Sequence, residues 1–483
     1  MARAARFTAA IVALATALWL LVGRGLVNYD TLYSLVWGRQ IAQGQAPDLE
    51  VPLAPTPHPL ATLAGVLASP LSMASDAGVH GEGAQTATIL LAFLALALLG
   101  WVVYALGRAW FDPWVGVLAA AIILTRRPVL DFGARAYVDI PYVVLVLGAL
   151  LVETRRPRAG LPVLALLAVA GLIRPEAWLF SGFYLAYLVW RGERDVRRVL
   201  VLGAVAASGP LLWALADWAL AGSPLHSLTG TRDTAETLGR VTGLDDVPVT
   251  VPRRLGEILR EPVLLGAAGG LALSWWALRD RVRPAIVAGV LALAAFCVLA
   301  AAGLPILGRY LLLPAAIGSI LCGAGAFGWR SLPEGDPRRR PWAWFGLVTL
   351  VALAAFVPAQ TGRIGDLRDA LHIQDSIQDD LRALVREPTG ALTSTCTPVG
   401  VPNHRPIPLL ALWLDVEPER VVSLQERTIA RGAYARPATA RVARDYVLDP
   451  RDLRKAIPPP PPGFGLVAAN RSWRVFERCA PGA

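Results

Sequence analysis

The feature that most constrains this chain is a set of long stretches that contain no charged residue. A helix needs about 17 to 25 apolar residues to cross a bilayer, and several stretches reach that length, among them residues 86–106, 285–308, 310–329 and 341–361. Of all residues, 55% are hydrophobic and 17% are charged, whereas soluble chains carry roughly a quarter charged residues. The sequence therefore predicts a mainly α-helical protein that crosses a membrane many times.

Hydropathy and loop charges together predict about eleven transmembrane helices. The expected spans are 7–23, 86–106, 114–125, 138–152, 161–173, 176–190, 199–220, 262–278, 285–302, 310–329 and 341–359. With the N-terminus inside, the densest arginine clusters fall in short cytoplasmic loops, as the positive-inside rule requires. The C-terminus then lies outside, together with the loops 24–85, 126–138 and 222–261. The same distribution accounts for the net charge of +10, so no nucleic-acid partner is expected.

Some of these spans are unusual. The first follows Arg3 and Arg6 as a signal peptide would, but no small-residue cleavage site follows it, and we expect it to be retained. The spans 114–125, 138–152 and 161–173 are shorter than a bilayer requires. Short spans indicate broken or tilted helices around an internal cavity, unless their true boundaries lie a few residues further out.

Residues 360–483 differ in composition from residues 1–359, which we expect to form the transmembrane domain. Their charges are dense and of both signs. An amphipathic helix is expected near 363–387, followed by strand-like runs at ALTSTC, VVSL, DYVL, FGLVAA and SWRVFERC. The prolines 458–462 would form a stiff connector. These patterns predict a small extracytoplasmic α/β domain.

Two of the four cysteines lie in this tail. Cys396 and Cys479 are near its two ends, and an oxidising exterior would favour a disulfide between them. The sequence therefore predicts that this pair closes the domain.

Asp30 follows the first span directly, in the stretch VNYDTLYSLVWGRQIAQ. Leu32, Leu35 and Val36 share one helical face, and Tyr33 suits a membrane interface, so a short helix lying along the membrane is expected. A carboxylate held there could act as a general base or a metal ligand. Asp30 could equally cap the N-terminus of this helix, and the two roles are compatible.

Further polar and ionisable residues gather on the expected outer side, where they are costly without a partner or a function. They are Arg135, Asp139, Arg174, Glu176 and Arg309 at the ends of spans, and His58, His226, Arg232 and Asp233 in loops.

A structural role is available for several of them. Asp139 begins a helix, where its charge favours the dipole. Arg174 suits planar, bidentate recognition of a phosphate, and Glu176 would either orient it or simply start the next helix. Arg309 would be a second phosphate contact or a snorkelling interfacial residue. The hydroxyl-rich loop 223–240 would recognise sugar hydroxyls or only fold the loop.

Several common motifs are absent from the sequence. It contains no Walker A loop, no H-E-x-x-H, no CxxC pair and no G-x-S-x-G. ATP-driven transport, zinc proteolysis and esterase-type serine chemistry therefore have no motif support.

Taken in order, the outer-side residues resemble the GT-C class of membrane glycosyltransferases, the polyprenyl-phosphate-sugar users related to protein mannosyltransferases and aminoarabinose transferases. The resemblance covers most of residues 1–330. It rests on Asp30, Gln43-Gly44-Gln45-Ala46-Pro47, His58-Pro59-Leu60, Arg135, Asp139, Pro141, Arg174-Pro175-Glu176 and Gly308-Arg309-Tyr310-Leu311. It also implies a multi-pass fold with a C-terminal extracytoplasmic domain.

The resemblance implies a role for each residue. Asp30 would deprotonate an acceptor hydroxyl as it attacks the anomeric carbon, with inversion, and Asp139 would support it or bind Mg²⁺ or Mn²⁺ with it. The leaving lipid phosphate would be held by Arg174, Arg309 and Arg135. The expected substrate contacts are His58, Glu176, Tyr33, His226 and Arg232.

One departure affects the metal. Many GT-C enzymes carry two adjacent acidic residues in the first outer loop, where this chain has Asp30-Thr31. A metal-binding pair is therefore not established by the resemblance. Asp48 or Glu50 could substitute for the missing carboxylate.

The implied protein is a glycosyltransferase of the bacterial cytoplasmic membrane, acting at its outer face among membrane lipids. Its donor would be a polyprenyl-phosphate-linked sugar, and its acceptor a glycan, a lipid or a protein. Two alternatives remain: a polytopic transporter or lipid flippase, and a catalytically inactive GT-C-like scaffold for envelope assembly.

Overall fold

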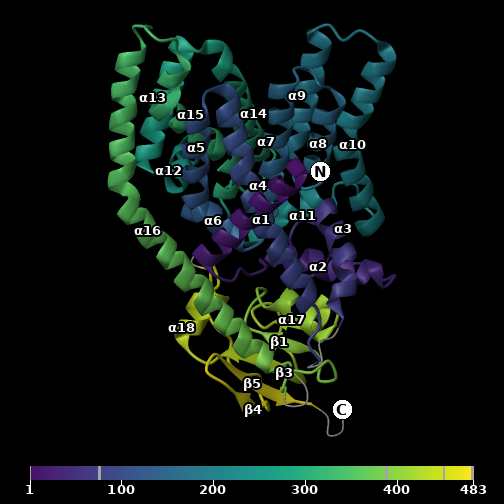
Figure 1. Cartoon of the computed structure of the whole chain (residues 1–483). Coiled ribbons are helices and arrows are strands. Elements are labelled where there is room, and N and C mark those ends of the chain that lie inside the picture. Colours follow the sequence, from purple (N-terminus) through teal and green to yellow (C-terminus); the bar gives the residue numbers. More distant parts are fainter. Residues whose placement is uncertain (1, 74–77, 387–389, 450–451, 480–483) are drawn as a thin grey trace. The chain divides into compact units, whose positions relative to one another are not determined.

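The computed structural model describes residues 2–73, 78–386, 390–449 and 452–479. Its Cα positions divide it into two compact units, each assembled from segments that are distant in the sequence (Figure 1). Unit 1 comprises Met1–Val22, Leu91–Ala216 and Val241–Leu367; unit 2 comprises Gly23–Leu90, Asp217–Arg240 and Arg368–Ala483. Parts of the predicted first outer loop (74–77) and tail (387–389, 450–451, 480–483) lie outside the described residues.

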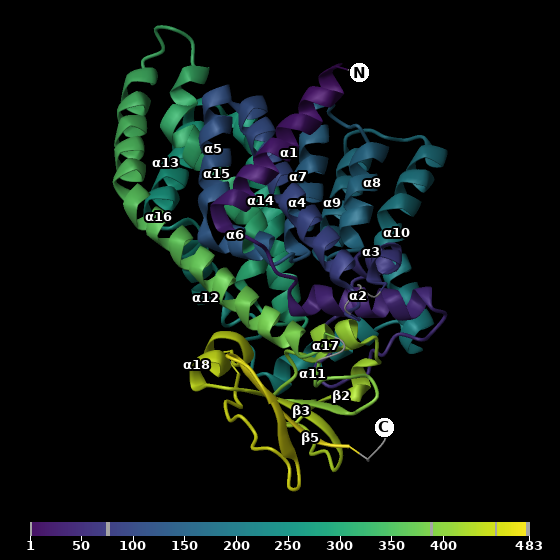
Figure 2. The ribbon, with the colours of Figure 1, turned by 60° about the horizontal axis from the view of Figure 1, so that its bottom comes forward.

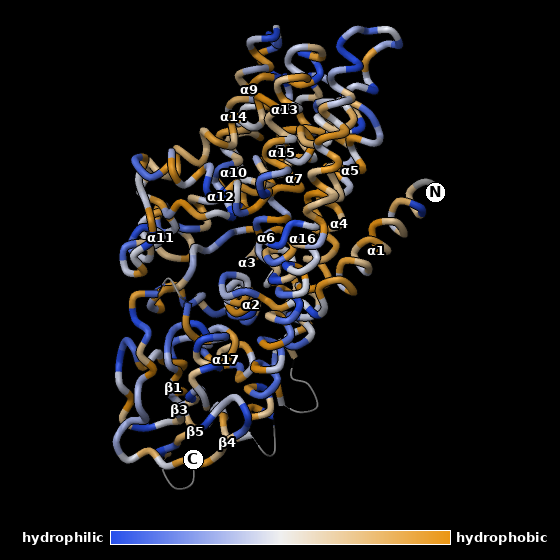
Figure 3. The backbone as a smooth tube through the Cα atoms, turned by 90° about the vertical axis from the view of Figure 1, so that its left-hand side faces the viewer, coloured by the Kyte–Doolittle hydropathy of each residue, from blue (hydrophilic) through white to orange (hydrophobic). Residues whose placement is uncertain are grey.

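The described part of unit 1 consists of helices and their connections. The helices are α1 (Ala2–Val22), α4 (Glu82–Trp110), α5 (Pro113–Thr125), α6 (Arg127–Ala134), α7 (Asp139–Arg155), α8 (Leu161–Gly171), α9 (Glu176–Trp190), α10 (Val196–Ala221), α12 (Val247–Leu259), α13 (Glu261–Ala277), α14 (Arg279–Ala301), η2 (Gly308–Leu311), α15 (Leu312–Phe327), η3 (Gly328–Ser331) and α16 (Arg339–Ala383). The unit boundaries fall inside α4, α10 and α16. Hydrophobic residues dominate α13, α14 and α15 (Figure 3).

Every predicted span coincides with a helix of the structure. Among the described residues, six helical stretches are long and apolar enough to cross a membrane, and the count is seven if α6 and α7, bent by 111° at their junction, form one broken span. The remaining predicted spans correspond to α5, α8, α9 and α13, which have 13, 11, 15 and 17 residues. Six to seven candidate spans are therefore shown, and the total of eleven stays a prediction.

Close contacts between small residues hold α15 at the centre of unit 1. A methyl group added at Gly270 of α13 would overlap the backbone oxygen of Leu321, and one added at Gly323 would lie 2.7 Å from the backbone oxygen of Val115 in α5. Helices in membranes commonly associate through such small residues. The turn η2, which precedes α15, packs against α12 and α14, and these contacts fix the position of Arg309 and Tyr310.

Unit 2 combines helices with the predicted C-terminal sheet. Its helices are α2 (Tyr29–Ala42), α3 (Pro59–Ala68), η1 (Ser69–Ser72), α11 (His226–Thr237), α17 (Ile407–Leu414), η4 (Pro418–Arg420), α18 (Ala440–Val442) and η5 (Ala443–Val447). Helix α17 lies beside α2 (Figures 1 and 2), and both helices contribute to one hydrophobic core.

The sheet is mixed, with the strand order β2-β1-β3-β5-β4. Strand β1 (Val399–Val401) is parallel to both β2 (Val421–Ser423) and β3 (Gly432–Pro437). Strand β5 (Trp473–Arg478) is antiparallel to β3 and to the edge strand β4 (Gly465–Ala469). The predicted α/β domain is therefore present in this region.

The individual strand predictions are partly wrong. The runs VVSL, FGLVAA and SWRVFERC contain strands, whereas DYVL falls mostly in the short helix η5 and ALTSTC forms bends. Strands β1 and β3 were missed. The first has three residues, and the second, GAYARP, is buried almost throughout, so neither shows the alternation of a half-exposed strand.

The prediction that α2 lies on the membrane as an amphipathic helix is wrong. All residues from Thr31 to Gln40 are buried within the structure, and Tyr33 and Trp37 are completely inaccessible. At Gly38, an added methyl group would overlap the backbone of Gly65 in α3. Helix α2 is therefore a core element of unit 2, locked against α3 at a contact between two glycines.

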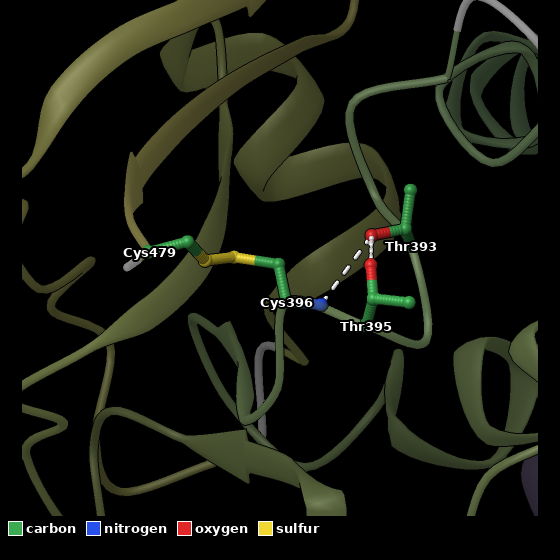
Figure 4. The surroundings of a disulfide bond; sticks show 4 residues. All are labelled: Thr393, Thr395, Cys396 and Cys479. Atoms are coloured by element: carbon green, nitrogen blue, oxygen red, sulfur yellow. Dashed lines mark hydrogen bonds between the residues drawn. A yellow bond between two sulfur atoms is a disulfide. The ribbon is translucent and has the colours of Figure 1, made fainter. Parts of the chain in front are cut away.

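Cys396 and Cys479 form a disulfide that joins the loop before β1 to the end of β5 (Figure 4). Thr393 supports the loop, since its Oγ1 accepts a hydrogen bond from the backbone nitrogen of Cys396 (3.4 Å) and is 2.9 Å from Oγ1 of Thr395. The crosslink spans 83 positions. Closing a loop of that length constrains the unfolded chain by about 4 kcal/mol.

Candidate functional site

Asp30 lies in the first turn of α2, and the residue that caps this helix is Asn28. The Asn28 Oδ1 accepts hydrogen bonds from the backbone nitrogens of Asp30 (2.9 Å) and Thr31 (3.2 Å). The capping role considered for Asp30 is therefore wrong. Its half-buried side chain stands in the first turn of the helix.

Two further candidates lie near Asp30 in the sequence. Tyr33 is completely buried, with its ring centroid 5.0 Å from that of Tyr29 and 5.1 Å from that of Trp37. His58 is half-buried and precedes α3, and its backbone oxygen accepts the first hydrogen bond of that helix, from Thr62 (2.9 Å). Tyr33 is thus placed for packing, whereas His58 is at least partly accessible.

The loop candidates His226 and Arg232 belong to α11. The side chain of Asp217 accepts hydrogen bonds from Ser227 N (2.9 Å) and Ser227 Oγ (2.7 Å), which anchors the start of this helix. Thr231 bonds to Thr56, in the segment that leads to His58. Unit 2 therefore brings α11 against the chain that follows α2. His226 is half-buried there and Arg232 is exposed.

Arg174 lies at the centre of a buried ion-pair network in unit 1. It is in the turn between α8 and α9 and is 5% exposed. Its Nη1 donates to Asp139 Oδ1 (2.6 Å), and its Nε (3.0 Å) and Nη2 (2.8 Å) donate to Glu176 Oε1. Asp139 begins α7 and Glu176 begins α9. Each carboxylate therefore both starts a helix and orients the guanidinium.

Two tyrosine rings cover the same guanidinium. Its Cζ lies 3.9 Å from the ring centroid of Tyr310 and 5.9 Å from that of Tyr142, which are distances for cation–π attraction. A cavity of about 10 Å³ between these rings and Glu176 has room for one water molecule. With its donors directed to carboxylates and its faces covered, Arg174 is placed to hold α7, α9 and η2 together.

Arg309 and Arg135 are more accessible than Arg174. Both side chains are about one-fifth exposed, against 6% for Arg174. Arg309 Nε is 3.9 Å from Asp139 Oδ2, and its guanidinium lies 5.2 Å from the ring centroid of Tyr137. Arg135 Nε donates to Asp131 Oδ1 at 2.6 Å. Arg309 and Arg135 are therefore more accessible to an anion than Arg174 is.

The surroundings of Asp139 do not suit a divalent metal ion. One carboxylate oxygen is bonded to Arg174 and the other faces Arg309, so the site already holds positive charge. Hard cations prefer several oxygen ligands. Within the described ranges, the one cluster of three side chains with metal-binding atoms is Cys396, Glu477 and Cys479, and its two cysteines are joined in the disulfide. Asp139 therefore does not fit the role of a ligand in the predicted Mg²⁺ or Mn²⁺ site.

Sequence reasoning did not single out Arg39, a buried cation of unit 2 that is 4% exposed. Its Nη1 is 2.8 Å from Asp415 Oδ1, and its guanidinium donates to the backbone oxygens of Ala411, Leu412 and Val416 at 3.2 to 3.4 Å. Burial lowers the pKa of Arg39, and the charge of Asp415 acts against this effect. The one available signal was that Arg39 is the only basic residue in the stretch VNYDTLYSLVWGRQIAQ.

Asp48 lies close to this group and carries an unfavourable charge. Burial, the largest cause, and the charges of the nearby Glu417, Glu419 and Glu50 together raise the pKa of its carboxyl to about 6. The backbone nitrogen of Glu419 donates to Asp48 Oδ2 (3.1 Å) and acts in the opposite direction. Asp48 is therefore neutral in part of the molecules near neutral pH.

Comparison with known proteins identifies a family segment and a fold. Residues 77–213 match the model of the dolichyl-phosphate-mannose-protein mannosyltransferase family, and this segment contains Arg135, Asp139, Arg174 and Glu176. The curated protein sequences contain no match to the chain.

Solved structures share the fold over almost all of the chain. ArnT from Cupriavidus metallidurans bound to undecaprenyl phosphate matches with a TM-score of 0.55 at 15% identity, over 98% of each chain. Its apo state matches with a TM-score of 0.53 at the same identity and coverage. An oligosaccharyltransferase from Archaeoglobus fulgidus in complex with zinc and sulfate matches over 85% of this chain and 62% of that chain, at 15% identity and a TM-score of 0.47. The chain has the ArnT fold, and the resemblance to GT-C membrane glycosyltransferases predicted from the sequence is confirmed.

Proposed function

We propose that this protein is a membrane glycosyltransferase that moves a sugar from a polyprenyl-phosphate donor to an acceptor hydroxyl, with inversion at the anomeric carbon. The observation that carries the proposal is the fold match to ArnT over 98% of both chains, together with the mannosyltransferase family segment at residues 77–213. ArnT itself is seen bound to undecaprenyl phosphate, which supports a lipid phosphate as the carrier here.

Asp30 is the proposed general base. Asn28 satisfies the first backbone donors of α2, so the Asp30 carboxylate is not required as the cap. In the proposed step, Asp30 removes the proton of the acceptor hydroxyl while the acceptor oxygen forms its bond to the anomeric carbon. The bond from that carbon to the phosphate oxygen breaks on the opposite side, and its electron pair leaves with the polyprenyl phosphate.

Arg309 and Arg135 are the proposed contacts of the leaving phosphate. Positive charge directed at the oxygen that gains negative charge stabilises the transition state. Arg174, although predicted to share this role, is occupied by Asp139 and Glu176, so we assign it to positioning: it holds Tyr310, and hence the turn that carries Arg309. His58, His226 and Arg232 remain the proposed substrate contacts of unit 2, and Tyr33 supports α2 from within its core.

The topology forms part of the same proposal. Eleven spans with the N-terminus inside would place the C-terminal domain, residues 360–483, on the outer side of a bacterial cytoplasmic membrane. The disulfide between Cys396 and Cys479 supports this orientation, since disulfides persist in oxidising compartments. The acceptor would be a glycan, a lipid or a protein hydroxyl.

Turnover by purified protein tests the proposal. Radiolabelled polyprenyl-phosphate sugars are incubated with wild type, with Asp30→Asn and with the matched control Asp233→Asn, which changes an exposed aspartate of α11. Wild type and control should release polyprenyl phosphate at equal rates. The Asp30→Asn rate should fall by about 100-fold or more, which is the contribution typical of a positioned base.

Two results would contradict the proposal in different ways. Equal rates for wild type and Asp30→Asn would remove Asp30 from the chemistry while leaving a transferase. Absence of turnover with every donor, accompanied by movement of labelled lipid across proteoliposomes, would establish a transporter instead.

A further inference from the structure

Unit 2 contains a second polar site, away from Asp30 at the opposite end of α2. It is a cavity of about 420 Å³, within the range of about 300–1,000 Å³ found for small-molecule sites. Its lining residues come from the end of α2 and from the C-terminal domain: Arg39, Gln40, Gln43, Gln45, Ser394, Asp415, Val416, Glu417 and Arg420. We refer to it as the glutamine pocket.

The charges of the glutamine pocket cancel. Arg39 is paired with Asp415 (2.8 Å), and Arg420 is 3.6 Å from Glu417. An anion such as a phosphate would therefore find no excess positive charge. The only aliphatic residue among the described lining residues is Val416, and none is aromatic. A lipid chain or an apolar peptide side chain would therefore find little apolar surface.

What remains is a dense set of uncharged groups that both donate and accept hydrogen bonds. Each glutamine amide supplies two N–H donors and a carbonyl acceptor, and the hydroxyl of Ser394 supplies both functions. Asp415 and Glu417 add further acceptors, and Arg420 adds further donors. A ligand covered with hydroxyl groups, each of which is a donor and an acceptor, is the chemical match for such a lining.

Two donors in the pocket wall are not satisfied by the described residues. Gln40 is 2% exposed, and its carbonyl accepts from the backbone nitrogen of Asp48 (3.2 Å), but its amide nitrogen has no hydrogen bond to any described residue. Arg39 Nε is buried and likewise has no acceptor within the described part of the chain. The amide nitrogen of Gln40 is therefore left for an acceptor in the pocket, whereas Arg39 Nε is enclosed by protein and is not offered to a ligand.

The wall that carries these donors is rigid. Helix α2 is locked against α3 by the contact of Gly38 with Gly65, and Arg39 ties it to the end of α17. On the other side, the disulfide at Cys396 fixes the loop that carries Ser394 (Figure 4). A site that is already ordered loses less conformational freedom when a ligand binds.

We propose that the glutamine pocket binds a neutral saccharide. Because it lies at the opposite end of α2 from Asp30, it would be a second carbohydrate site, distinct from the one at which Asp30 would act. That the bound saccharide is part of the acceptor rests on the proposed function, whereas saccharide binding itself does not.

Titration of neutral saccharides into full-length protein in nanodiscs, by isothermal titration calorimetry, tests the pocket. The probes are mannotriose, arabinotriose and maltotriose, with inorganic phosphate as the anionic comparison. The variants are Gln43→Ala/Gln45→Ala, which removes two exposed amides from the pocket, and the control Arg474→Ala, which changes an exposed side chain of β5.

At least one neutral trisaccharide should bind to wild type and control with equal affinity, and the double variant should bind it at least tenfold more weakly with an unchanged thermal midpoint. Binding that survives the double substitution would overturn the proposal, as would failure of all three trisaccharides to bind or stronger binding of phosphate. Donor turnover is measured on the same preparations. Saccharide binding without turnover would count against the transferase alone, and turnover without saccharide binding against the pocket alone.

Discussion

Arg174 in unit 1 and Arg39 in unit 2 are both buried almost completely, and the two arginines are neutralised in different ways. In unit 1, Arg174 donates to two carboxylates, Asp139 and Glu176, that are themselves buried. In unit 2, Arg39 meets one carboxylate, Asp415, which is 35% exposed, and otherwise binds backbone oxygens at the end of α17.

The two arginines have different partners, and this gives the two sites different roles. Arg174 belongs to a closed network in which removal of the arginine leaves two buried carboxylates without their cation. The partial negative charge of a helix C-terminus is spread over several carbonyl groups, so Arg39 is held without using all of its donors. The network around Arg174 stabilises the fold of unit 1, whereas the group around Arg39 forms part of the wall of the glutamine pocket.

The largest expected effect comes from breaking the closed network. Arg174→Met leaves the carboxylates of Asp139 and Glu176 buried without their cation, and we expect a loss of about 3 to 5 kcal/mol in the free energy of unfolding. Hydrogen exchange followed by mass spectrometry should show faster exchange in α7 and α9. The triple variant Arg174→Met/Asp139→Asn/Glu176→Gln should recover part of the loss. If the triple variant exchanges as fast as Arg174→Met, unpaired charge is not the cause of the faster hydrogen exchange.

A smaller effect is expected from the open site. Arg39→Met removes donors from the end of α17, but Asp415 can be hydrated, so we expect a loss of about 2 kcal/mol, from two or three hydrogen bonds of about 1 kcal/mol each. The thermal midpoint should fall less than for Arg174→Met, and faster hydrogen exchange should be confined to α2 and α17. Arg39→Lys keeps the charge but not the planar group, so its thermal midpoint should lie between those of wild type and Arg39→Met. An Arg39→Met loss as large as that of Arg174→Met would erase the distinction between the sites.

The smallest expected effect concerns Asp48, which lies near Arg39 and whose pKa is raised mainly by burial. Because the folded state holds the proton more tightly than the unfolded state, this group makes unit 2 less stable as the pH rises from about 4 to about 6, and the full cost persists above pH 6. Asp48→Asn should therefore stabilise the protein at pH 7, by about 1 kcal/mol once solvent screening of this partly exposed group is allowed for.

The thermal midpoints of wild type and Asp48→Asn should differ at pH 7 and converge toward pH 4. His404 titrates in the opposite sense, since burial lowers its pKa to about 4, but it is common to both proteins and cancels in the difference. Curves that stay parallel across this range would show that folding does not raise the pKa of Asp48.

The sequence predicted the features that are encoded locally. Every apolar run became a helix, because a run of such length in a membrane can satisfy its backbone in few other ways. The common sidedness of Asp139, Arg174 and Glu176 was also readable, since it follows from loop charges. The disulfide pair was accessible for a similar reason: only two cysteines lie in the tail.

The sequence could not show what depends on distant partners. The pattern of α2 looks amphipathic, but α17, almost 370 residues later, covers what would have been its polar face around Arg39. The same partner creates the glutamine pocket. Arg174 looked like a free phosphate ligand because nothing in its neighbourhood of the sequence shows that Asp139, 35 positions earlier, takes one of its donors. Strand β1 has three residues and is specified by its neighbours in the sheet.

The glycine contact that locks α2 against α3 has one more consequence. Asp30 stands in the first turn of this helix and Gln40 in its last, and ten helical residues at 1.5 Å each separate them by about 15 Å. The contact of Gly38 with Gly65 fixes the position of α2 against α3. The distance between the two ends of α2 therefore stays constant. An acceptor anchored in the pocket would reach Asp30 only if it were long enough to span this distance, so the shortest usable saccharide would be set by the number of residues in one helix.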